Sequence, residues 1–202
     1  EEGERIAPAV REFLQANARL DSVIEQVASS RTEIIRVSAY ASIAMHWLPG
    51  IIQRFREECP DVDVDIRMAD HVDVPYELLA QGKMDAILVS PQDEGQYEWV
   101  HLADDPMFAV LPRDFDTQGM TAFPLAAFEA RDFIMPSQGF DKDIMRIFNR
   151  IGVKPHILPT WVDDPTVISM VSHGLGVSMM TELTLRGRGD GVLLVPVEPS
   201  SA

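Results

Sequence analysis

The stretch from IIRVSAY (34–40) to KMDAILV (83–89) decides the fold of this 202-residue chain, because strand-like and helix-like segments alternate along it. Residues 34–40 form an apolar, β-branched run, and VDVDI (62–66) alternates strictly between apolar and acidic residues. Helical segments are expected between the strands, at residues 42–59 and 74–81. Strands that alternate with helices in this way predict a parallel sheet with helical crossovers. In such sheets, ligands bind beyond the carboxyl ends of the strands.

A second α/β set follows a turn-rich break at residues 114–119. The expected strands are 133–135, 156–162, 175–180 and 192–197, and the expected helices are 140–151 and 166–173. Asp164 is expected to cap the second of these helices, with Pro165 at its first position. We therefore expect an α/β protein with two lobes, joined by two short crossovers near residues 110–116 and 186–191.

Residues 1–33 lie outside the alternating pattern and carry a heptad seam. Its members recur at spacings of four and three: Ile6, Val10, Phe13, Asn17, Leu20, Ile24 and Val27. The single amide in the seam, Asn17, can fix the register and the number of partners. The pattern predicts a helix that dimerises, and the alternative is an amphipathic helix packed on its own domain. Pro8 is tolerated if the helix begins close to it.

Composition limits the possible partners. The chain is 46% hydrophobic and 24% charged, which is ordinary for a soluble protein with a sizeable core. It has no apolar run near the roughly 20 residues that cross a bilayer, so we expect no membrane partner. A single cysteine, Cys59, excludes an internal disulfide and fits a cytoplasmic location. The net charge of −15 opposes nucleic-acid binding by this chain alone.

The residues carry no recognisable catalytic chemistry. The histidines have no metal-ligand spacing and are His46, His71, His101, His156 and His173. There is no phosphate-binding loop, dinucleotide fingerprint or nucleophile elbow. We therefore expect neither an enzyme nor a bound cofactor or metal.

Several motifs, in their order and spacing, resemble the LysR-type transcriptional regulators over essentially the whole chain. The stretch GERIAPAVREFL (3–14) resembles the linker helix of that family, and IRVSAYASIAMHWLP (35–49) resembles its first strand and helix. Further landmarks are FREECPDV (55–62), LAQGKMDAIL (79–88), MFAVLP (107–112) and VSHGLGVSMM (171–180). The resemblance implies a two-lobed, periplasmic-binding-protein-like (type 2) effector-binding domain preceded by a linker helix.

The resemblance also implies a domain organisation and a set of partners. The linker and dimerisation helix is expected at 1–33, regulatory lobe I at 34–111 and 190–202, and regulatory lobe II at 112–189. The winged helix-turn-helix of such regulators is absent, so we expect a piece of a longer protein that meets DNA only through that missing domain. A homodimer or homotetramer that binds a small-molecule effector is expected. The alternative is a free solute-binding protein of the same fold.

The effector is expected in the cleft between the lobes, at polar residues that follow the strands. In lobe I these are Ser38, Tyr40, Ser42, His71, Val72 and Ser90, and in lobe II they are Ser137, Gln138, Asp163 and Thr166. The resemblance implies that Ser42 and the turn at His71–Val72 line this pocket. Ser42 and Asp164 equally fit simple helix N-caps. Helix N-termini favour an anionic effector, whereas the acidic residues Asp70, Asp163 and Asp164 suit an amine or a hydroxyl.

Overall fold

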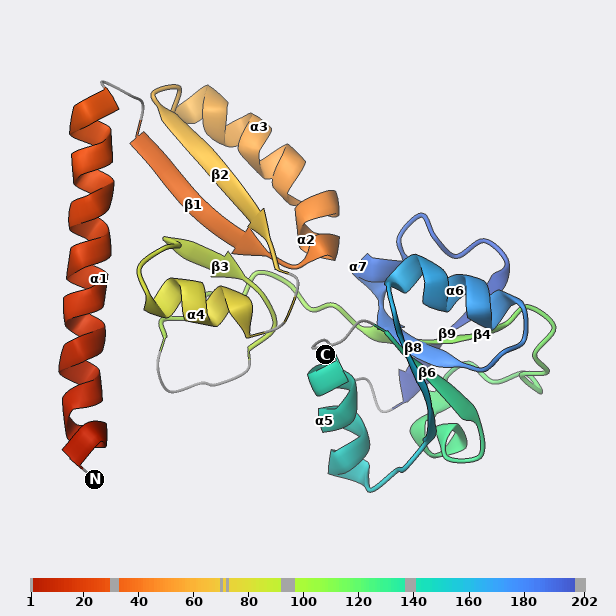
Figure 1. The fold of residues 1–202 in the computed structure, drawn as a ribbon. Coiled ribbons are helices and arrows are strands. Elements are labelled where there is room, and N and C mark those ends of the chain that lie inside the picture. Colours follow the sequence, from red (N-terminus) through yellow and green to blue (C-terminus); the bar gives the residue numbers. More distant parts are fainter. Residues whose placement is uncertain are drawn as a thin grey trace. The chain divides into compact units, whose positions relative to one another are not determined.

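A computed structural model describes residues 2–29, 33–69, 71, 73–91, 97–136 and 141–198 (Figure 1). The chain divides into two compact units, of which unit 1 is Glu1–Gly95 and unit 2 is Gln96–Ala202. Three expected effector residues, Val72, Ser137 and Gln138, lie outside the described residues. Within the described ranges, no helix has both the length and the apolar character that crossing a membrane requires.

The predicted N-terminal helix is present as α1 (Glu2–Ser29). The members of its seam from Ile6 to Ile24 are open to solvent, and the side chain of Val27 lies outside the described part of the chain. Ile6, Phe13 and Ile24 are 59%, 68% and 54% exposed. Asn17 Nδ2 donates a hydrogen bond of 3.2 Å to Asp21 Oδ2, one turn further along the same helix. Pro8 lies inside α1, so the helix lacks the hydrogen bond that an amide at this position would donate.

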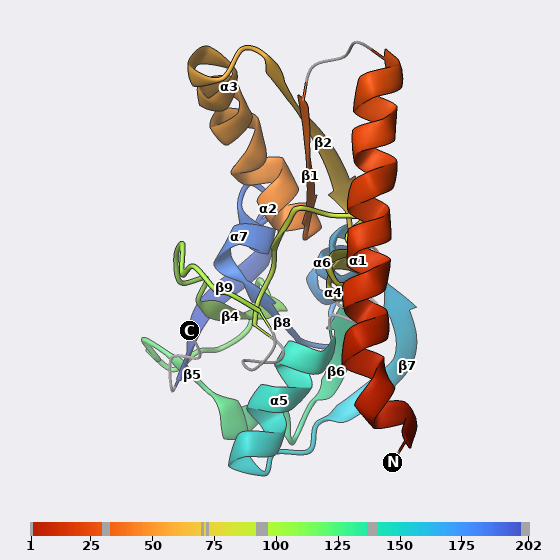
Figure 2. The same cartoon turned by 90° about the vertical axis from the view of Figure 1, so that its left-hand side faces the viewer.

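The parallel sheet predicted for residues 34–89 is confirmed in unit 1. Its strands are β1 (Glu33–Ala39), β2 (Val62–Met68) and β3 (Ala86–Leu88), in the order β2-β1-β3. The helices are α2 (Ala41–His46), α3 (Leu48–Glu58) and α4 (Val74–Ala80). Helices α2 and α3 pack along β2, and α4 packs along β3 (Figures 1 and 2). Because all three strands run in the same direction, their carboxyl ends share one edge of the sheet.

The prediction of a single helix at residues 42–59 is wrong, because the structure has two helices there, separated at Trp47. Pro49 is near the start of the second helix, α3, and has no amide hydrogen. A continuous helix would need that hydrogen for a bond to the carbonyl of Met45. Proline is favoured in the first turn of a helix, where an amide has no partner, so the chain ends one helix and begins another.

Unit 2 contains a mixed four-stranded sheet and a separate parallel pair. The four strands are β4 (Met107–Pro112), β5 (Phe123–Pro124), β8 (Ser178–Thr181) and β9 (Val192–Glu198), in the order β5-β9-β4-β8. Strand β9 runs antiparallel to β4 and parallel to β5. The parallel pair is β6 (Asp132–Pro136) with β7 (His156–Val162). The short strand β5 was not expected from the sequence.

Aromatic side chains form the core of unit 2. The short 3-10 helix η1 (Leu125–Phe128) and the helices α5 (Asp141–Ile151), α6 (Asp164–Ser172) and α7 (Glu182–Leu185) complete this unit. Four fully buried rings pack edge to face or tilted, and they belong to Phe123, Phe128, Phe133 and Phe148. Phe148 comes from α5 and Phe133 from β6, so the cluster attaches that helix to the parallel pair.

The division into units differs from the lobe boundaries expected from the sequence. Those boundaries placed residues 107–111 and 190–202 with the first lobe. In the structure, strands β4 and β9 pair with each other, and β4 also pairs with β8, so all three belong to unit 2. The pairing of strands so distant in the sequence has no local signal that would have predicted it.

Gly176 is a position where the fold tolerates no side chain. A Cβ atom placed there would lie 2.7 Å from the carbonyl oxygen of Asp132, which is backbone and has little freedom to move. We therefore expect Gly176→Ala to lower the free energy of unfolding of unit 2 by about 1–3 kcal/mol. The control is Gly50→Ala in α3, where a Cβ meets nothing within 4 Å. That substitution is expected to stabilise the helix by about 0.5–1 kcal/mol. Urea denaturation of both variants measures the difference, and equal effects would contradict the close approach at Gly176.

Candidate functional site

The carboxyl edge of the unit 1 sheet brings together two of the expected effector residues. Tyr40 follows β1 and Ser90 follows β3. The Tyr40 amide donates to the carbonyl of Leu88 at 3.3 Å, which extends the pairing of the two strands to their ends. Beyond it, Tyr40 Oη lies 3.4 Å from Ser90 Oγ. Two hydroxyl groups therefore lie next to each other at the edge where ligands bind in parallel sheets.

Ser42 lies at the same edge but does not cap a helix. Helix α2 begins at Ala41, and the N-cap position belongs to Tyr40, which has the extended backbone that the position requires. The interpretation of Ser42 as an N-cap is therefore wrong. Its side chain is half-buried and makes no hydrogen bond with the described residues. A hydroxyl without a structural role suits contact with a ligand.

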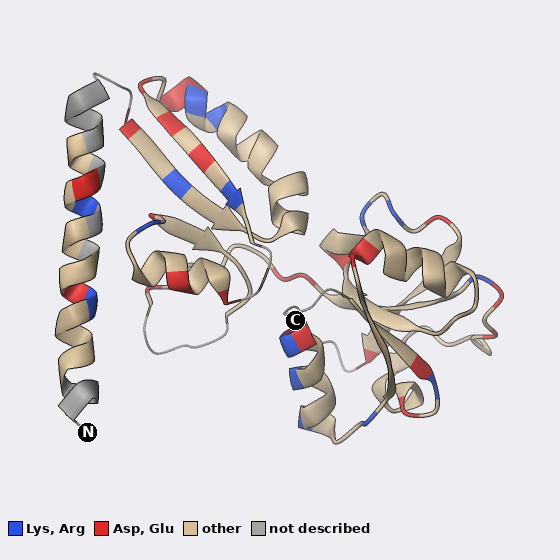
Figure 3. Ribbon diagram, viewed as in Figure 1, with Lys and Arg blue, Asp and Glu red and all other residues tan. Residues whose placement is uncertain are grey.

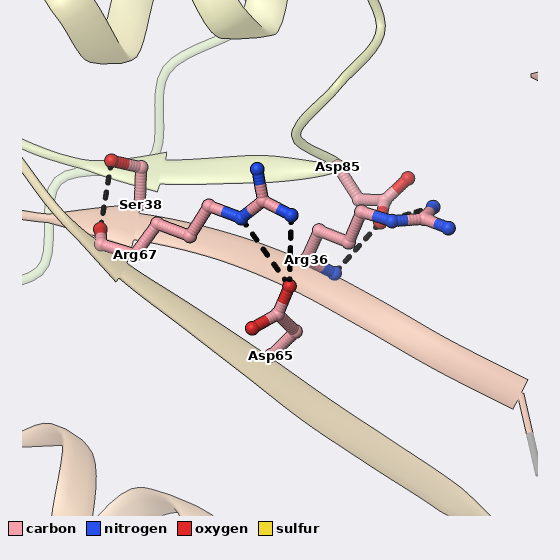
Figure 4. A network of polar contacts seen from close by, with 5 residues as sticks. All are labelled: Arg36, Ser38, Asp65, Arg67 and Asp85. Carbon is pink, nitrogen blue, oxygen red and sulfur yellow. Dashed lines mark hydrogen bonds and ion pairs between the residues drawn. The ribbon is translucent and has the colours of Figure 1, made fainter. Parts of the chain in front are cut away.

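Ser38 has a structural role in the sheet. It is fully buried, and its hydroxyl donates to the carbonyl of Arg67 in β2 at 3.0 Å (Figure 4). On the same strand, the amide of Arg36 donates to Asp85 Oδ2 at 2.8 Å, which fixes the start of the β1–β3 pairing (Figure 4). The effector role of Ser38 stays a prediction, and this buried hydrogen bond argues against it because a ligand would have to replace it.

His71 lies in the connection between β2 and α4 and is held by Asp73. Its Nδ1 accepts a hydrogen bond of 3.3 Å from the Asp73 amide and lies 3.6 Å from Asp73 Oδ2. The His71 side chain is 39% exposed. The local contact orients the ring with Nδ1 toward the backbone, so Nε2 is the nitrogen that faces away from this turn.

The two expected residues of unit 2 form the start of α6. Asp163 is the N-cap, and its Oδ1 accepts a hydrogen bond of 3.0 Å from the Thr166 amide. The expectation that Asp164 caps this helix is therefore wrong, because Asp163 has the extended backbone of an N-cap and Asp164 is already helical. The hydrogen bonds from Thr166 lower the pKa of the Asp163 carboxyl. The Asp163 carboxylate thus occupies the Thr166 amide, and its negative charge opposes the binding of an anion at this helix N-terminus.

Asp164 has the opposite electrostatic behaviour. Burial raises the pKa of its carboxyl, and Arg188, with Nη1 4.0 Å from Asp164 Oδ2, partly offsets that increase. The contact links the start of α6 to the turn before β9. Arg188, which belongs to the same unit, therefore provides the positive charge beside the partly buried Asp164 carboxyl.

Tyr76 is a residue of this edge that the sequence analysis missed. It lies in α4, and its hydroxyl donates to the carbonyl of Ser90 at 2.6 Å. A tyrosine in the first turn of a helix has no distinctive spacing, so only the fold reveals its contact with the end of β3. The carboxyl edge of unit 1 is thus lined by two phenols and two serine hydroxyls, from Tyr40, Tyr76, Ser42 and Ser90.

A shallow hollow on α5 contains none of the expected effector residues. It is lined by Lys142, Met145, Arg146, Asn149 and Arg150. The three basic residues recur at every fourth position and give this helix a basic stripe (Figure 3). Arg146 Nη1 lies 3.2 Å from Asp143 Oδ1. The hollow is open and formed by a single helix face, so we do not assign it to the effector.

The described residues also contain no group of three His, Cys, Asp or Glu side chains placed to hold a metal ion. The polar groups of Tyr40, Ser42, Tyr76 and Ser90 at the carboxyl edge of unit 1 are hydroxyls and backbone amides, which form hydrogen bonds and are poor metal ligands.

Comparison with known proteins decides the family. The LysR substrate binding domain matches residues 28–202. The chain belongs to this family. Its sequence is 23% identical over 185 residues to the uncharacterised HTH-type transcriptional regulator YvbU of Bacillus subtilis, and the match covers 92% of this chain and 63% of YvbU. The chain spans about three fifths of the length of the curated relatives it matches.

Solved structures agree on the fold. The regulatory domain of CcmR from Synechocystis PCC6803, in complex with 2-PG, superposes with a TM-score of 0.71 at 17% identity, covering 83% of this chain and 82% of that one. The effector binding domain of QuiR in complex with shikimate gives a TM-score of 0.68 at 17% identity, covering 85% and 83%. The LysR fold, two-lobed and periplasmic-binding-protein-like, predicted from the resemblance is therefore confirmed.

Proposed function

We propose that this chain is the effector-sensing domain of a cytoplasmic LysR-type transcription regulator. The match to the LysR substrate binding domain over residues 28–202 carries this proposal. Binding of a small molecule would alter DNA binding by a helix-turn-helix domain of the same protein. The curated relatives YvbU, TtuA and CysB are HTH-type transcriptional regulators, which supports a sensor rather than an enzyme.

The effector is proposed to bind at the carboxyl edge of the unit 1 sheet. Ser42 provides a half-buried hydroxyl without a partner in the described residues, and Tyr40 and Ser90 provide two adjacent hydroxyls. The first turn of α2 contains no acidic residue, so nothing in that turn repels a ligand oxygen. CcmR and QuiR were solved with 2-PG and shikimate, respectively, and molecules of this size with several oxygens suit such an edge.

A thermal-shift screen tests the proposal. The library contains small oxygen-rich acids, polyols and amines, with 2-PG and shikimate among them, and calorimetric titration follows for each compound that raises the melting temperature. A ligand at 100 times its dissociation constant is expected to stabilise the domain by about 2.7 kcal/mol. A library of this breadth without a single binder would contradict an effector-sensing role.

The sensing domain alone is expected not to bind DNA. With a net charge of −15, it would repel the phosphate backbone instead of releasing its counterions. A gel-shift titration at moderate salt, with duplexes selected from a random library, should show no complex at nanomolar protein. A nanomolar, sequence-specific complex would contradict both the charge argument and the assignment of DNA binding to another domain.

A further inference from the structure

Helix α5 presents a basic surface on a chain whose net charge is −15. The residues that line its hollow are Lys142, Met145, Arg146, Asn149 and Arg150. Lys154 lies just beyond the end of the helix and is exposed, like Arg150. Arg150 and Lys154 make no ion pair with any residue that the structure describes, so their charges are not compensated there. We call the five lining residues and Lys154 the α5 surface.

The junction between α3 and β2 carries the opposite charge. Five acidic residues occur at positions 57–65, and no basic residue lies among them. Asp65 is paired with Arg67, whose Nε lies 3.4 Å from Asp65 Oδ2. The other four are exposed and make no hydrogen bond or ion pair inside the described ranges, and they are Glu57, Glu58, Asp61 and Asp63. We call these four the acidic cluster, and Figure 3 shows acidic residues at the end of α3 and along β2.

The surroundings of the acidic cluster leave room for a partner. Strand β2 is at the edge of the unit 1 sheet, so its outer side pairs with no other strand of the described residues. On α3, Ile51 lies seven residues before Glu58 and therefore on the same face of the helix, and its side chain is 48% exposed. On the α5 surface, the half-buried Met145 lies among the cations. Each surface thus combines charged groups with an apolar side chain, as contacts between proteins do.

A second copy of this chain is the partner that fits the α5 surface. Each copy has both surfaces, so a two-fold axis can bring the α5 surface of each copy to the acidic cluster of the other. With a net charge of −15, two copies repel each other, and contacts that match opposite charges offset this repulsion. The heptad seam of α1 is expected to pair two copies. Within such a pair the effective concentration is on the order of millimolar, so a small contact suffices.

We propose that the α5 surface of one copy binds the acidic cluster of a second copy. Arg150 and Lys154 meet the unpaired carboxylates of the cluster, and Met145 packs against Ile51. The contact forms twice in a symmetric dimer, in addition to the pairing of the α1 helices. It concerns assembly and is independent of the effector function proposed above.

Crosslinking with a carbodiimide tests this contact directly, because the reagent joins a lysine amine to a carboxylate that touches it. The chain has three lysines, which are Lys83, Lys142 and Lys154. Chains labelled with 15N are mixed with unlabelled chains, and mass spectrometry of the digest separates links between copies from links within one copy. We expect Lys154 to be linked to the acidic cluster of a second copy. Lys83, in the turn before β3, is the control and should give no such link.

Charge reversal tests the same contact through the affinity between copies. The first variant, Arg150→Glu with Lys154→Glu, makes the chain more negative, and the second, Glu57→Lys with Asp61→Lys, makes it less negative. Each is expected to raise the dissociation constant of the dimer about tenfold in analytical ultracentrifugation, the effect of two lost charge pairs. General repulsion alone would instead make the second variant associate more tightly than the wild type.

A matched control separates the contact from net charge. Arg113→Glu with Arg186→Glu changes two exposed cations outside the α5 surface and lowers the net charge as much as the first variant. Its dissociation constant should stay within about twofold of the wild type, because charges far from a contact are screened by salt.

A mixture of the two charge-reversed proteins is the decisive measurement, because both contacts of the mixed dimer again join opposite charges. The dissociation constant of the mixed dimer should return to within about threefold of the wild type, which unfolded variants could not achieve. Three results would each overturn the proposal. They are crosslinks of Lys154 to the acidic cluster within one copy only, wild-type affinity in either charge-reversed variant, and a mixture that associates no more tightly than its components.

Discussion

Replacing Ser42 with Trp is expected to weaken effector binding by about 100-fold or more, a loss of about 2.7 kcal/mol. Ser42 is half-buried in the first turn of α2, and its hydroxyl makes no hydrogen bond with the described residues. An indole ring at this position would fill the space that the ligand needs and would remove a hydrogen-bond partner. Calorimetric titration with a compound identified by the thermal-shift screen measures the loss.

The fold should survive this substitution, since no side chain of the described residues depends on the Ser42 hydroxyl. Circular dichroism of the variant is therefore expected to match that of the wild type. Gln53→Trp, at an exposed position of α3 in the same unit, is the matched control and should bind the effector normally. Unchanged affinity in a folded Ser42→Trp protein would show that the effector binds elsewhere.

The open seam of α1 is expected to drive self-association. Val10, Phe13 and Leu20 are 46%, 68% and 56% exposed in the single chain, and such an apolar stripe, interrupted by Asn17, is costly in water. The mass in solution should therefore be at least twice 22.5 kDa. The double variant Phe13→Glu, Leu20→Glu would place charges inside the paired helices and should raise the dissociation constant by about 100-fold.

Analytical ultracentrifugation over a range of concentrations measures this change. Glu12→Lys also alters charge on α1 but lies outside the seam, so it should associate like the wild type. Association of the double variant at wild-type strength would show that surfaces other than α1 hold the chains together. The predicted role of α1 as the main contact between chains would then be wrong.

Local patterns predicted the parallel sheet of unit 1 and the long N-terminal helix, because both have periodicities that short windows of sequence contain. They did not predict which of two adjacent aspartates caps α6, because Asp163 and Asp164 have the same chemistry and only the backbone conformation separates them. The division of the helix at Trp47 was also missed, because the local pattern does not show whether Pro49 lies within one helix or begins a second one. Pro49 was taken as part of one helix, whereas it begins a second one.

The features of the candidate site that the sequence did not predict depend on contacts between residues distant in the chain. Tyr40 and Ser90 were expected at the same edge because both follow parallel strands, and the structure places their hydroxyls 3.4 Å apart. Tyr76 was missed because its partner is a backbone carbonyl 14 residues further along the chain, which no motif encodes. The structural role of Ser38 was missed because the sequence does not show that its hydroxyl is buried and bonded to the neighbouring strand. Any serine near the end of a strand has the same local pattern.

The pairing of β9 has a consequence for how the protein is made. Strand β9 lies between β4 and β5, and its register pairs Phe108 with Pro196 and Phe123 with Val197. All three strands of unit 1 are complete by Leu88, so that sheet can form while the ribosome is still synthesising the rest. Unit 2 must wait for residues 192–198 to emerge, and closing such long loops slows folding. Until then, β4 and β5 each have an unpaired edge, and at this stage of synthesis the nascent chain is most exposed to aggregation and most dependent on chaperones.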